Sequence, residues 1–274
     1  HPDPGTIIGI QLFGESAEDI IRAAKIVQEE GADFIDLNLG CPVKKVVKKG
    51  CGAALMRDPG YLEKFLCQIK RGIDLPLTVK MRTGWSEEEL TIHECVLAAT
   101  NAGCEWVAIH GRTRTQGYDG KADWDLIGEA KARAKIPIIG NGDIRSAPKA
   151  RQCLETAQVD AVMIGRGALR NPWIFLECLG ELGRNPLTEI DLLNRYHGKL
   201  EKYYDTRIIL ILLRKFSTWL AFGYPDSAVF RRSMFELRTV REVMDCAEEF
   251  FLKAQQLPKP RFDETEAFLM GGHG

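Results

Sequence analysis

The sequence predicts an α/β fold, a (β/α)8 TIM barrel followed by a small all-helical domain. Short apolar, β-branched runs alternate with segments of helical period from residue 7 to about residue 170, and one repeat is about 30 residues long, the size of a β/α unit. Polar residues stand at the carboxyl ends of successive runs. Because every strand of a barrel ends at one mouth, whereas an open doubly wound sheet needs such ends only near its switch point, the barrel is favoured.

The strands are expected to be buried on both faces, because the runs look continuously apolar rather than alternating. The expected strands are Ile7–Phe13, Phe34–Asn38, Leu77–Arg82, Trp106–His110, Ile136–Asn141 and Asp160–Gly165. The amphipathic helices expected between them are Ala17–Glu30, Gly60–Gly72, Glu87–Ala102, Ala122–Ala134 and Ala147–Thr156. Closure needs eight strands, so two β/α units, roughly 60 residues, are expected to be absent before His1.

From Leu187 onward the pattern becomes purely helical. Helices are expected over Leu192–Tyr203, Ile208–Ala221 and Ala228–Lys253, with a break at Gly223–Asp226. We therefore expect a barrel domain over residues 1–184, a helical domain over 185–257 and a flexible tail over 258–274.

The composition excludes several classes of protein. The 37 Lys and Arg residues against 38 Asp and Glu residues give a net charge of −1, so any polyanion contact must be a local patch. No apolar run approaches the roughly 20 residues of a membrane span. The eight cysteines are scattered without paired spacing, which favours a reduced, cytoplasmic chain. Neither a metal nor a membrane partner is expected. A monomer is expected.

The loop after the second expected strand carries a candidate catalytic thiol. Cys41 follows the strand end directly, between Gly40 and Pro42, and four lysines come after it. A free thiol with a pKa near 8.5 can act as a general acid as readily as it can attack as a nucleophile. Among the five histidines, only His110 lies at another expected strand end. A Cys–His nucleophilic pair is therefore possible, but nothing else in the sequence supports it. Cys51, between two glycines, reads as a small filler residue.

Two glycine-rich strand ends predict a phosphate site. Gly140–Ile144 and Ile164–Ala168 follow the last two expected strands, where barrels commonly bind phosphate through backbone N–H groups. Arg166 adds charged donors. Ordinary turn glycines are the alternative.

Further polar groups are expected at the same mouth. Lys80 ends an otherwise apolar strand and could form a Schiff base, hydrogen-bond an electron-rich cofactor ring, or make a structural salt bridge. The Gln11 amide suits the edge of a flat heterocycle, and Arg112 and Arg114 could hold a second phosphate-bearing ligand. A phosphate cradle, amide and amine edges and one thiol acid together fit a barrel that binds flavin mononucleotide (FMN).

These residues form motifs that resemble the tRNA-dihydrouridine synthases, most closely the bacterial B-type branch. The resemblance runs from about Ile10 to Phe175, with a looser continuation through the helical region. In chain order, the motifs are Gln11–Gly14, Asp36–Pro42, Val79–Gly84, His110–Thr113, Gly140–Ile144 and Ile164–Ala168. The family also opens with a strand ending in a Pro-Met-Ala segment that nothing before Gln11 matches, which agrees with the expected missing units.

The resemblance implies that FMN is reduced by NADPH and passes a hydride to C6 of a tRNA uridine, while Cys41 protonates C5. It implies that Asn38 orients the uracil, with Arg112 and Arg114 also on the substrate side. The implied cofactor-binding residues are Gln11, Lys80, His110, Asn141, Gly142, Asp143, Gly165 and Arg166.

The resemblance also implies that the helical domain binds tRNA. Its basic residues are Arg207, Arg214, Lys215, Arg231, Arg232, Arg238 and Arg241, although Phe216 stands where the family pattern has His. Two alternatives stay open: an FMN oxidoreductase acting on a free pyrimidine, similar to a dihydroorotate dehydrogenase, and a non-catalytic tRNA-binding protein.

Overall fold

The computed structural model describes residues 5–183 and 187–257. The chain forms two compact units, the first from His1–Asp143 with Ala150–Ile164 and the second from Ile144–Lys149 with Gly165–Gly274. The domain boundary expected at 184/185 and the tail expected over 258–274 lie outside the described residues. Within the described part, none of the helices is both long and apolar enough to cross a bilayer.

A parallel sheet forms the centre of the first unit and confirms the predicted α/β class. Its strand order is β1-β2-β3-β4-β5-β6, so each strand pairs with its neighbour in the chain. A doubly wound sheet reverses this order at its switch point, whereas a barrel does not. The strands are β1 (Gly9–Leu12), β2 (Phe34–Leu39), β3 (Leu77–Arg82), β4 (Val107–His110), β5 (Ile138–Asn141) and β6 (Ala161–Met163).

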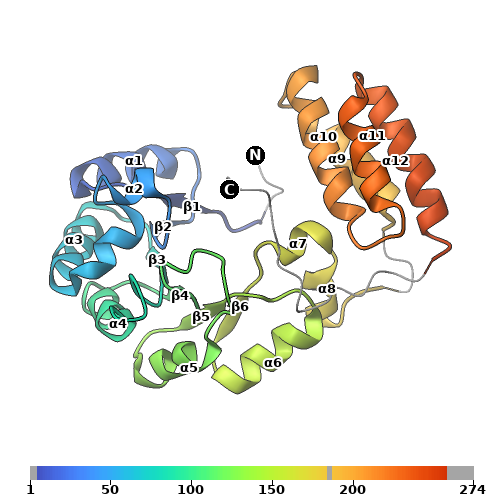
Figure 1. The fold of residues 1–274 in the computed structure, drawn as a ribbon. Coiled ribbons are helices and arrows are strands. Elements are labelled where there is room, and N and C mark those ends of the chain that lie inside the picture. The colour runs from blue at the N-terminus through green and yellow to red at the C-terminus, as the bar shows by residue number, and fades with distance from the viewer. Residues whose placement is uncertain (1–4, 184–186, 258–274) are drawn as a thin grey trace. The chain divides into compact units, whose positions relative to one another are not determined.

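Helices cover the outer face of this sheet, as Figure 1 shows for α1, α3, α4 and α5. Ser16, Asp58 and Asp123 cap α1, α3 and α5 by accepting hydrogen bonds from backbone N–H groups of the first turn. The helices of this region are α1 (Ala17–Glu29), α2 (Lys44–Val47), the 3-10 helix η1 (Gly52–Arg57), α3 (Pro59–Gly72), α4 (Ile92–Asn101), α5 (Trp124–Arg133) and α6 (Ala147–Ala157).

The start predicted for α4 is wrong by several residues. Glu87 was expected to begin the helix, but it begins at Ile92 after Thr91. The preceding residues form a turn in which the Trp85 backbone N–H donates to the Glu89 carbonyl. That turn lengthens the loop that follows β3.

The expectation that the strands are buried on both faces holds for β3 and β4, which are buried at nearly every position, but it is wrong for β1 and β2, which alternate. On β2, Ile35, Leu37 and Leu39 are fully buried, whereas Asp36 and Asn38 are half-buried. Successive side chains of a strand point to opposite faces. The apolar set packs into the hydrophobic core with the helices, and the other face carries the polar set.

The second unit contains more helices than predicted. The helix expected over Ala228–Lys253 is two helices, because Thr239 and Glu242 form a capping box that starts a new one. Leu193, Leu213, Val243 and Phe251 are among the buried core residues. The helices are α7 (Gly167–Arg170), α8 (Ile174–Leu179), α9 (Glu189–Leu200), α10 (Thr206–Leu220), α11 (Ser227–Glu236) and α12 (Val240–Ala254).

Candidate active site at the carboxyl ends of the strands

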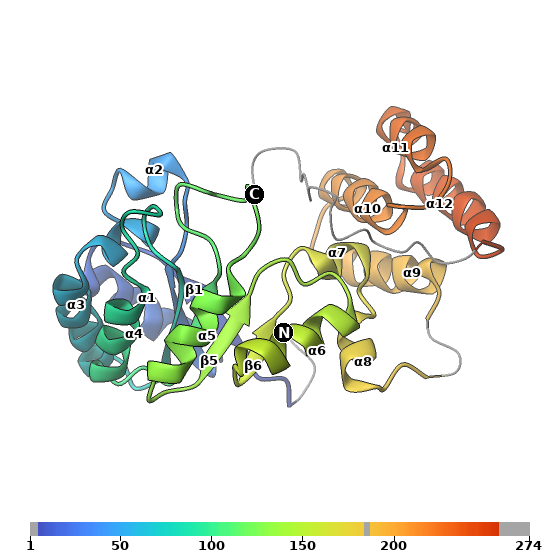
Figure 2. The same ribbon diagram turned by 60° about the horizontal axis from the view of Figure 1, so that its bottom comes forward.

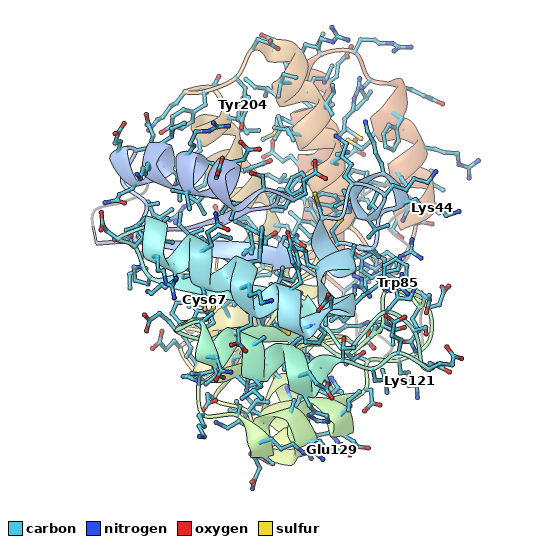
Figure 3. All side chains as sticks on the ribbon, turned by 90° about the vertical axis from the view of Figure 1, so that its left-hand side faces the viewer. Lys44, Cys67, Trp85, Lys121, Glu129 and Tyr204 are labelled. Carbon is cyan, nitrogen blue, oxygen red and sulfur yellow. The ribbon has the colours of Figure 1, made fainter. Side chains whose placement is uncertain are left out.

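The loops that follow β2, β3 and β4 gather at one edge of the first unit's sheet. In Figure 2 this edge is at the top, with α2 above the strands. Figure 3 shows Lys44, Trp85 and Lys121, one from each of the three loops, along the same edge. The strand order therefore brings chemistry from distant parts of the chain to one place.

Cys41 sits in a tight turn at this edge. The Asn38 Oδ1 atom accepts hydrogen bonds from the backbone N–H groups of Gly40, at 3.0 Å, and Cys41, at 2.9 Å. Gly52 packs against the same turn with φ +60°, and a Cβ added there would lie 3.0 Å from the Cys41 Cβ. No His, and no other described residue, hydrogen-bonds to the Cys41 Sγ atom. Since no base contacts the thiol, the geometry favours a proton donor over an activated nucleophile.

Cys51 lies in the same loop but is buried, and burial raises the pKa of its thiol. This agrees with its reading as a filler residue.

Lys80 lies beside Asn38, its registered partner across β2 and β3. Among the described residues its ammonium makes no hydrogen bond or ion pair. Desolvation, followed by the nearby Arg82 charge, lowers the pKa of Lys80 from 10.5 to about 8, against an opposing effect of Asp36. A desolvated ammonium without a partner is expensive in free energy, so this group fits an electron-rich ligand better than a structural salt bridge.

Gln11 faces the same edge from β1. Its Nε2 atom donates to Asp36 Oδ2 at 2.6 Å, and its Oε1 atom accepts from Asn38 Nδ2 at 2.9 Å. An amide has two N–H donors and two acceptor lone pairs, so one of each remains for a ligand. This is the pattern predicted for a heterocycle edge.

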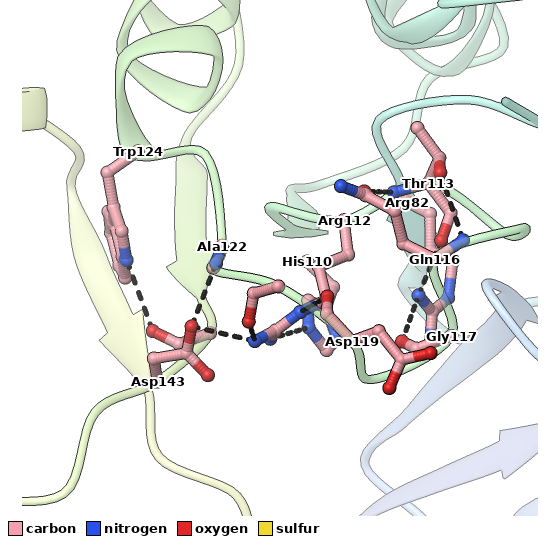
Figure 4. A network of polar contacts seen from close by, with 12 residues as sticks. Arg82, His110, Arg112, Thr113, Gln116, Gly117, Asp119, Ala122, Trp124 and Asp143 are labelled. Carbon is pink, nitrogen blue, oxygen red and sulfur yellow. Dashed lines mark hydrogen bonds and ion pairs between the residues drawn. The ribbon is translucent and has the colours of Figure 1, made fainter. Parts of the chain in front are cut away.

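Arg112 occupies the interior of the loop after β4, which Figure 4 shows close by. Its guanidinium, only 3% exposed, donates to the carbonyls of Asp119 and Gly120 and to Asp143 Oδ2 at 2.9 Å. It also lies 3.3 Å from His110 Nε2. These bonds make Arg112 a structural residue that orders the loop beside His110. Its predicted contact with substrate has no support in this geometry.

Sequence reasoning missed Arg82 as a site residue. This buried side chain donates to the Gly40 carbonyl at 2.7 Å and to the Thr113 and Gly117 carbonyls at 2.8 Å each. It therefore ties the Cys41 loop to the loop after β4. The available signal was a second cation two positions after Lys80, and hence on the same face of β3.

The end of β5 is held by side chains that the prediction assigned to a phosphate. Asn141 Nδ2 donates to the Met163 carbonyl at 2.7 Å, and the Asp143 carboxylate accepts from Arg112 and from the Ala122 backbone N–H. Gly142 has φ +136°, and a Cβ there would lie 2.4 Å from the Ala122 Cβ. The Asn141 amide keeps its Oδ1 atom and one N–H for another partner, and the phosphate contact stays a prediction. Gly165 and Arg166 lie in the second unit, where Arg166 precedes α7.

Arg114 lies against an aromatic ring rather than free at the edge. Its guanidinium carbon is 4.6 Å from the centre of the Trp85 ring, and that of Arg57 is 4.7 Å from it. Arg57 is paired in turn with Glu89. The Arg114 Nε atom is buried with no hydrogen-bond partner within the described chain, and the predicted contact of Arg114 with a substrate stays a prediction.

FMN fits the residues present. Lys80 offers an ammonium that has no partner in the described part of the chain, Gln11 an open amide edge, and Gly142 a turn that excludes a side chain. Within residues 5–183 and 187–257, no group of three or more His, Cys, Asp or Glu side chains could hold a metal ion.

Comparisons with known proteins identify the family of this chain. The family model for dihydrouridine synthases matches residues 1–256. A probable tRNA-dihydrouridine synthase of Rickettsia bellii (strain RML369-C) is 37% identical over 91% of this chain and 78% of that protein. The tRNA-dihydrouridine synthase B of Proteus vulgaris is 36% identical over 92% of this chain and 80% of that protein. A solved structure of morphinone reductase in complex with tetrahydroNAD has a TM-score of 0.43 at 15% identity, over 64% of this chain and 51% of that one. The chain belongs to the dihydrouridine synthase family.

Proposed function

We propose that this protein is an FMN-dependent tRNA-dihydrouridine synthase that uses NADPH as reductant. The observation that carries the proposal lies at one edge of the parallel sheet, where, within residues 5–183 and 187–257, the Cys41 thiol contacts no base and the Lys80 ammonium has no partner. Family membership and the names of the relatives support the substrate class. The proposal includes a catalytic barrel over residues 1–184, a tRNA-binding helical domain over 185–257 and a cytoplasmic location.

Each site residue has a separate role in the proposed reduction. Bound FMN would supply the hydride for C6 of the uracil. Cys41 donates its proton to C5 and takes one back from solvent, so one hydride and one proton saturate the C5–C6 bond. Lys80 and Gln11 would hold the ring system through hydrogen bonds, with His110 beside them, while Asn141, Gly142 and Asp143 would hold the phosphate end.

Access to the base requires RNA rearrangement, because a stacked uridine cannot reach a pocket and must be extruded. Asn38 orients the extruded uracil through the N–H that its other contacts leave free, and Arg114 contributes on the substrate side. Exposed cations favour RNA backbone binding. They are Lys44, Lys45, Lys48 and Lys49 around α2, and Arg207, Lys215, Arg231, Arg232, Arg238 and Arg241 in the helical unit.

One basic residue of the helical unit is used differently. Arg214 reaches from α10 to the carbonyl of Leu237, the residue that follows α11. It stabilises the break between α11 and α12, and we assign it no RNA contact.

The test begins with the purified protein. A yellow colour with flavin absorbance at about 450 nm establishes the cofactor, and dihydrouridine formed in tRNA during a single turnover establishes the reaction. Reduction of free uracil or orotate instead would favour the free-pyrimidine alternative. Tight tRNA binding without flavin would favour a non-catalytic role.

Cys41→Ala tests the acid. We expect flavin binding and NADPH oxidation to persist while dihydrouridine formation falls by about 10²- to 10⁴-fold, the usual contribution of a general acid. Cys67→Ala is the matched control, because Cys67 is also a half-buried free thiol but lies on α3. An unchanged product yield in Cys41→Ala would remove this thiol from the mechanism.

A further inference from the structure

A chain of side-chain hydrogen bonds connects three strands to the Cys41 turn. Gln11, Asp36 and Thr78 are registered partners on β1, β2 and β3. Thr78 Oγ1 donates to Asp36 Oδ1 at 2.7 Å, and Gln11 Nε2 donates to Asp36 Oδ2 at 2.6 Å. Asn38 Nδ2 then donates to Gln11 Oε1 at 2.9 Å. We call these four side chains the amide relay.

The relay has a direction because a carboxylate only accepts hydrogen bonds. With Asp36 as acceptor, Gln11 must present Nε2 to it and therefore presents Oε1 to Asn38. Asn38 must in turn present Nδ2 to Gln11. Its Oδ1 atom is thereby left for the backbone N–H groups of Gly40 and Cys41, and those two bonds use both of its lone pairs.

We propose that Asn38 is a positioning residue that couples the Gln11 amide to the turn carrying Cys41, through a relay whose polarity Asp36 sets. The inference rests on the proposed function and adds to it, because it assigns Asn38 to the enzyme's own geometry as well as to the uracil. One amide then orients both the cofactor-facing edge of Gln11 and the proton donor. Preorganised geometry of this kind is what supporting residues contribute to catalysis.

The relay predicts a specific suppressor. In Asn38→Asp the new carboxylate still accepts from the two backbone N–H groups but faces the Gln11 Oε1 atom. If the Gln11 amide turns over, its oxygen faces the Asp36 carboxylate instead. In either orientation of Gln11, one of its contacts therefore places two hydrogen-bond acceptors against each other. Adding Asp36→Asn supplies a donor for the turned amide, and D36N/N38D then has a complete relay of reversed polarity with the original net charge.

Asp36→Asn alone is expected to be mild. The new amide can turn its oxygen toward Gln11, and the Thr78 hydroxyl can donate to the Ile35 carbonyl, which lies 3.4 Å away. The suppressor therefore keeps a complete set of hydrogen bonds by itself and loses only the attraction between the Asp36 carboxylate and Lys80. Only a requirement for matched hydrogen-bond polarity predicts that Asp36→Asn, which adds no new bond by itself, rescues Asn38→Asp.

The first measurement is flavin affinity together with urea unfolding of the flavin-free protein. We expect D36N/N38D to exceed Asn38→Asp by about tenfold both in flavin affinity and in the folding equilibrium constant. Both variants carry the same carboxylate beside Lys80, so its attraction for the ammonium cancels in this comparison. Asp33→Asn is the matched control. The Asp33 carboxylate accepts from the Ile8 backbone N–H at 2.7 Å, outside the relay, so D33N/N38D has the same charge but should recover neither.

The second measurement follows the thiol directly. We expect Asn38→Ala to change the alkylation rate of Cys41 by iodoacetamide, relative to Cys67 in the same sample, by about fivefold, because the turn loses both side-chain hydrogen bonds. Asp36→Asn should not restore this ratio, since it supplies nothing to the turn. Mass spectrometry of the flavin-free protein reports both thiols.

The outcomes are decisive for the relay. If Asn38→Asp does not fold, a folded D36N/N38D is itself the predicted rescue. Equal recovery by D33N/N38D, no recovery by D36N/N38D, or an unchanged Cys41 ratio in Asn38→Ala would overturn the inference. A wild-type protein that binds no flavin would refute the proposed function, whereas the unfolding and alkylation measurements would still test the relay.

Discussion

Removing the charge of Lys80 is expected to raise the stability of the flavin-free protein and to lower its affinity for the cofactor. Its ammonium is desolvated and has no hydrogen-bond partner among the described residues, and its pKa falls from 10.5 to about 8. That difference corresponds to about 3 kcal/mol of differential interaction between the two protonation states. Lys80→Met keeps the length of the stem and removes the charge, so we expect the flavin-free variant to be up to about 3 kcal/mol more stable at pH 7.

The pH dependence follows from proton linkage. Between pH 8 and 10.5 the unfolded chain keeps the Lys80 proton while the folded chain has lost it. The unfolded state therefore binds more protons, and the stability of the wild type rises with pH across this window. The advantage of Lys80→Met should be constant below pH 8, shrink between pH 8 and 10.5, and vanish above.

Urea unfolding of flavin-free wild type and variant at several pH values measures this difference. Lys64→Met, at an exposed position of α3, is the control for loss of one positive charge. The same Lys80→Met substitution should weaken flavin binding by about ten- to a hundredfold, the range for a hydrogen bond from a charged donor. A difference between wild type and Lys80→Met that stays flat from pH 7 to 10.5 would refute the reasoning.

Three further substitutions test the scaffold by urea unfolding. Arg82→Met removes a buried cation with three carbonyl partners and should destabilise by about 3–5 kcal/mol, so a loss below 1 kcal/mol would contradict its role as a tie between loops. Gly142→Ala should cost about 2–4 kcal/mol, because φ is +136° and the new Cβ would meet that of Ala122; a neutral effect would show that the turn relaxes. Thr239→Val should cost about 1 kcal/mol through loss of its cap on the Glu242 N–H, and Thr239→Ser should retain most of it.

The sequence determined the parallel architecture and the position of its chemistry. The apolar runs recur about every 30 residues, the length of one β/α unit, and so predict where the strands lie. In a parallel sheet built this way, the polar residues at the carboxyl ends of the strands lie at the same edge. The confirmed strands end near the predicted residues, including Asn38, Lys80, His110 and Asn141. The capping box of Thr239 and Glu242 was also readable from local spacing, and a helix boundary was missed there.

Only the tertiary structure decided what each of these polar groups does. Arg112 and Arg82 are equally basic in sequence, but Arg82 donates to carbonyls of two other loops, whereas Arg112 donates to carbonyls of its own loop and to Asp143. The direction of the relay through Asp36 depends on three strands in register. Hydrogen bonding is directional and short-ranged, so the partner of a polar side chain is set by chain segments far away in sequence. Periodicity within one segment carries no information about them.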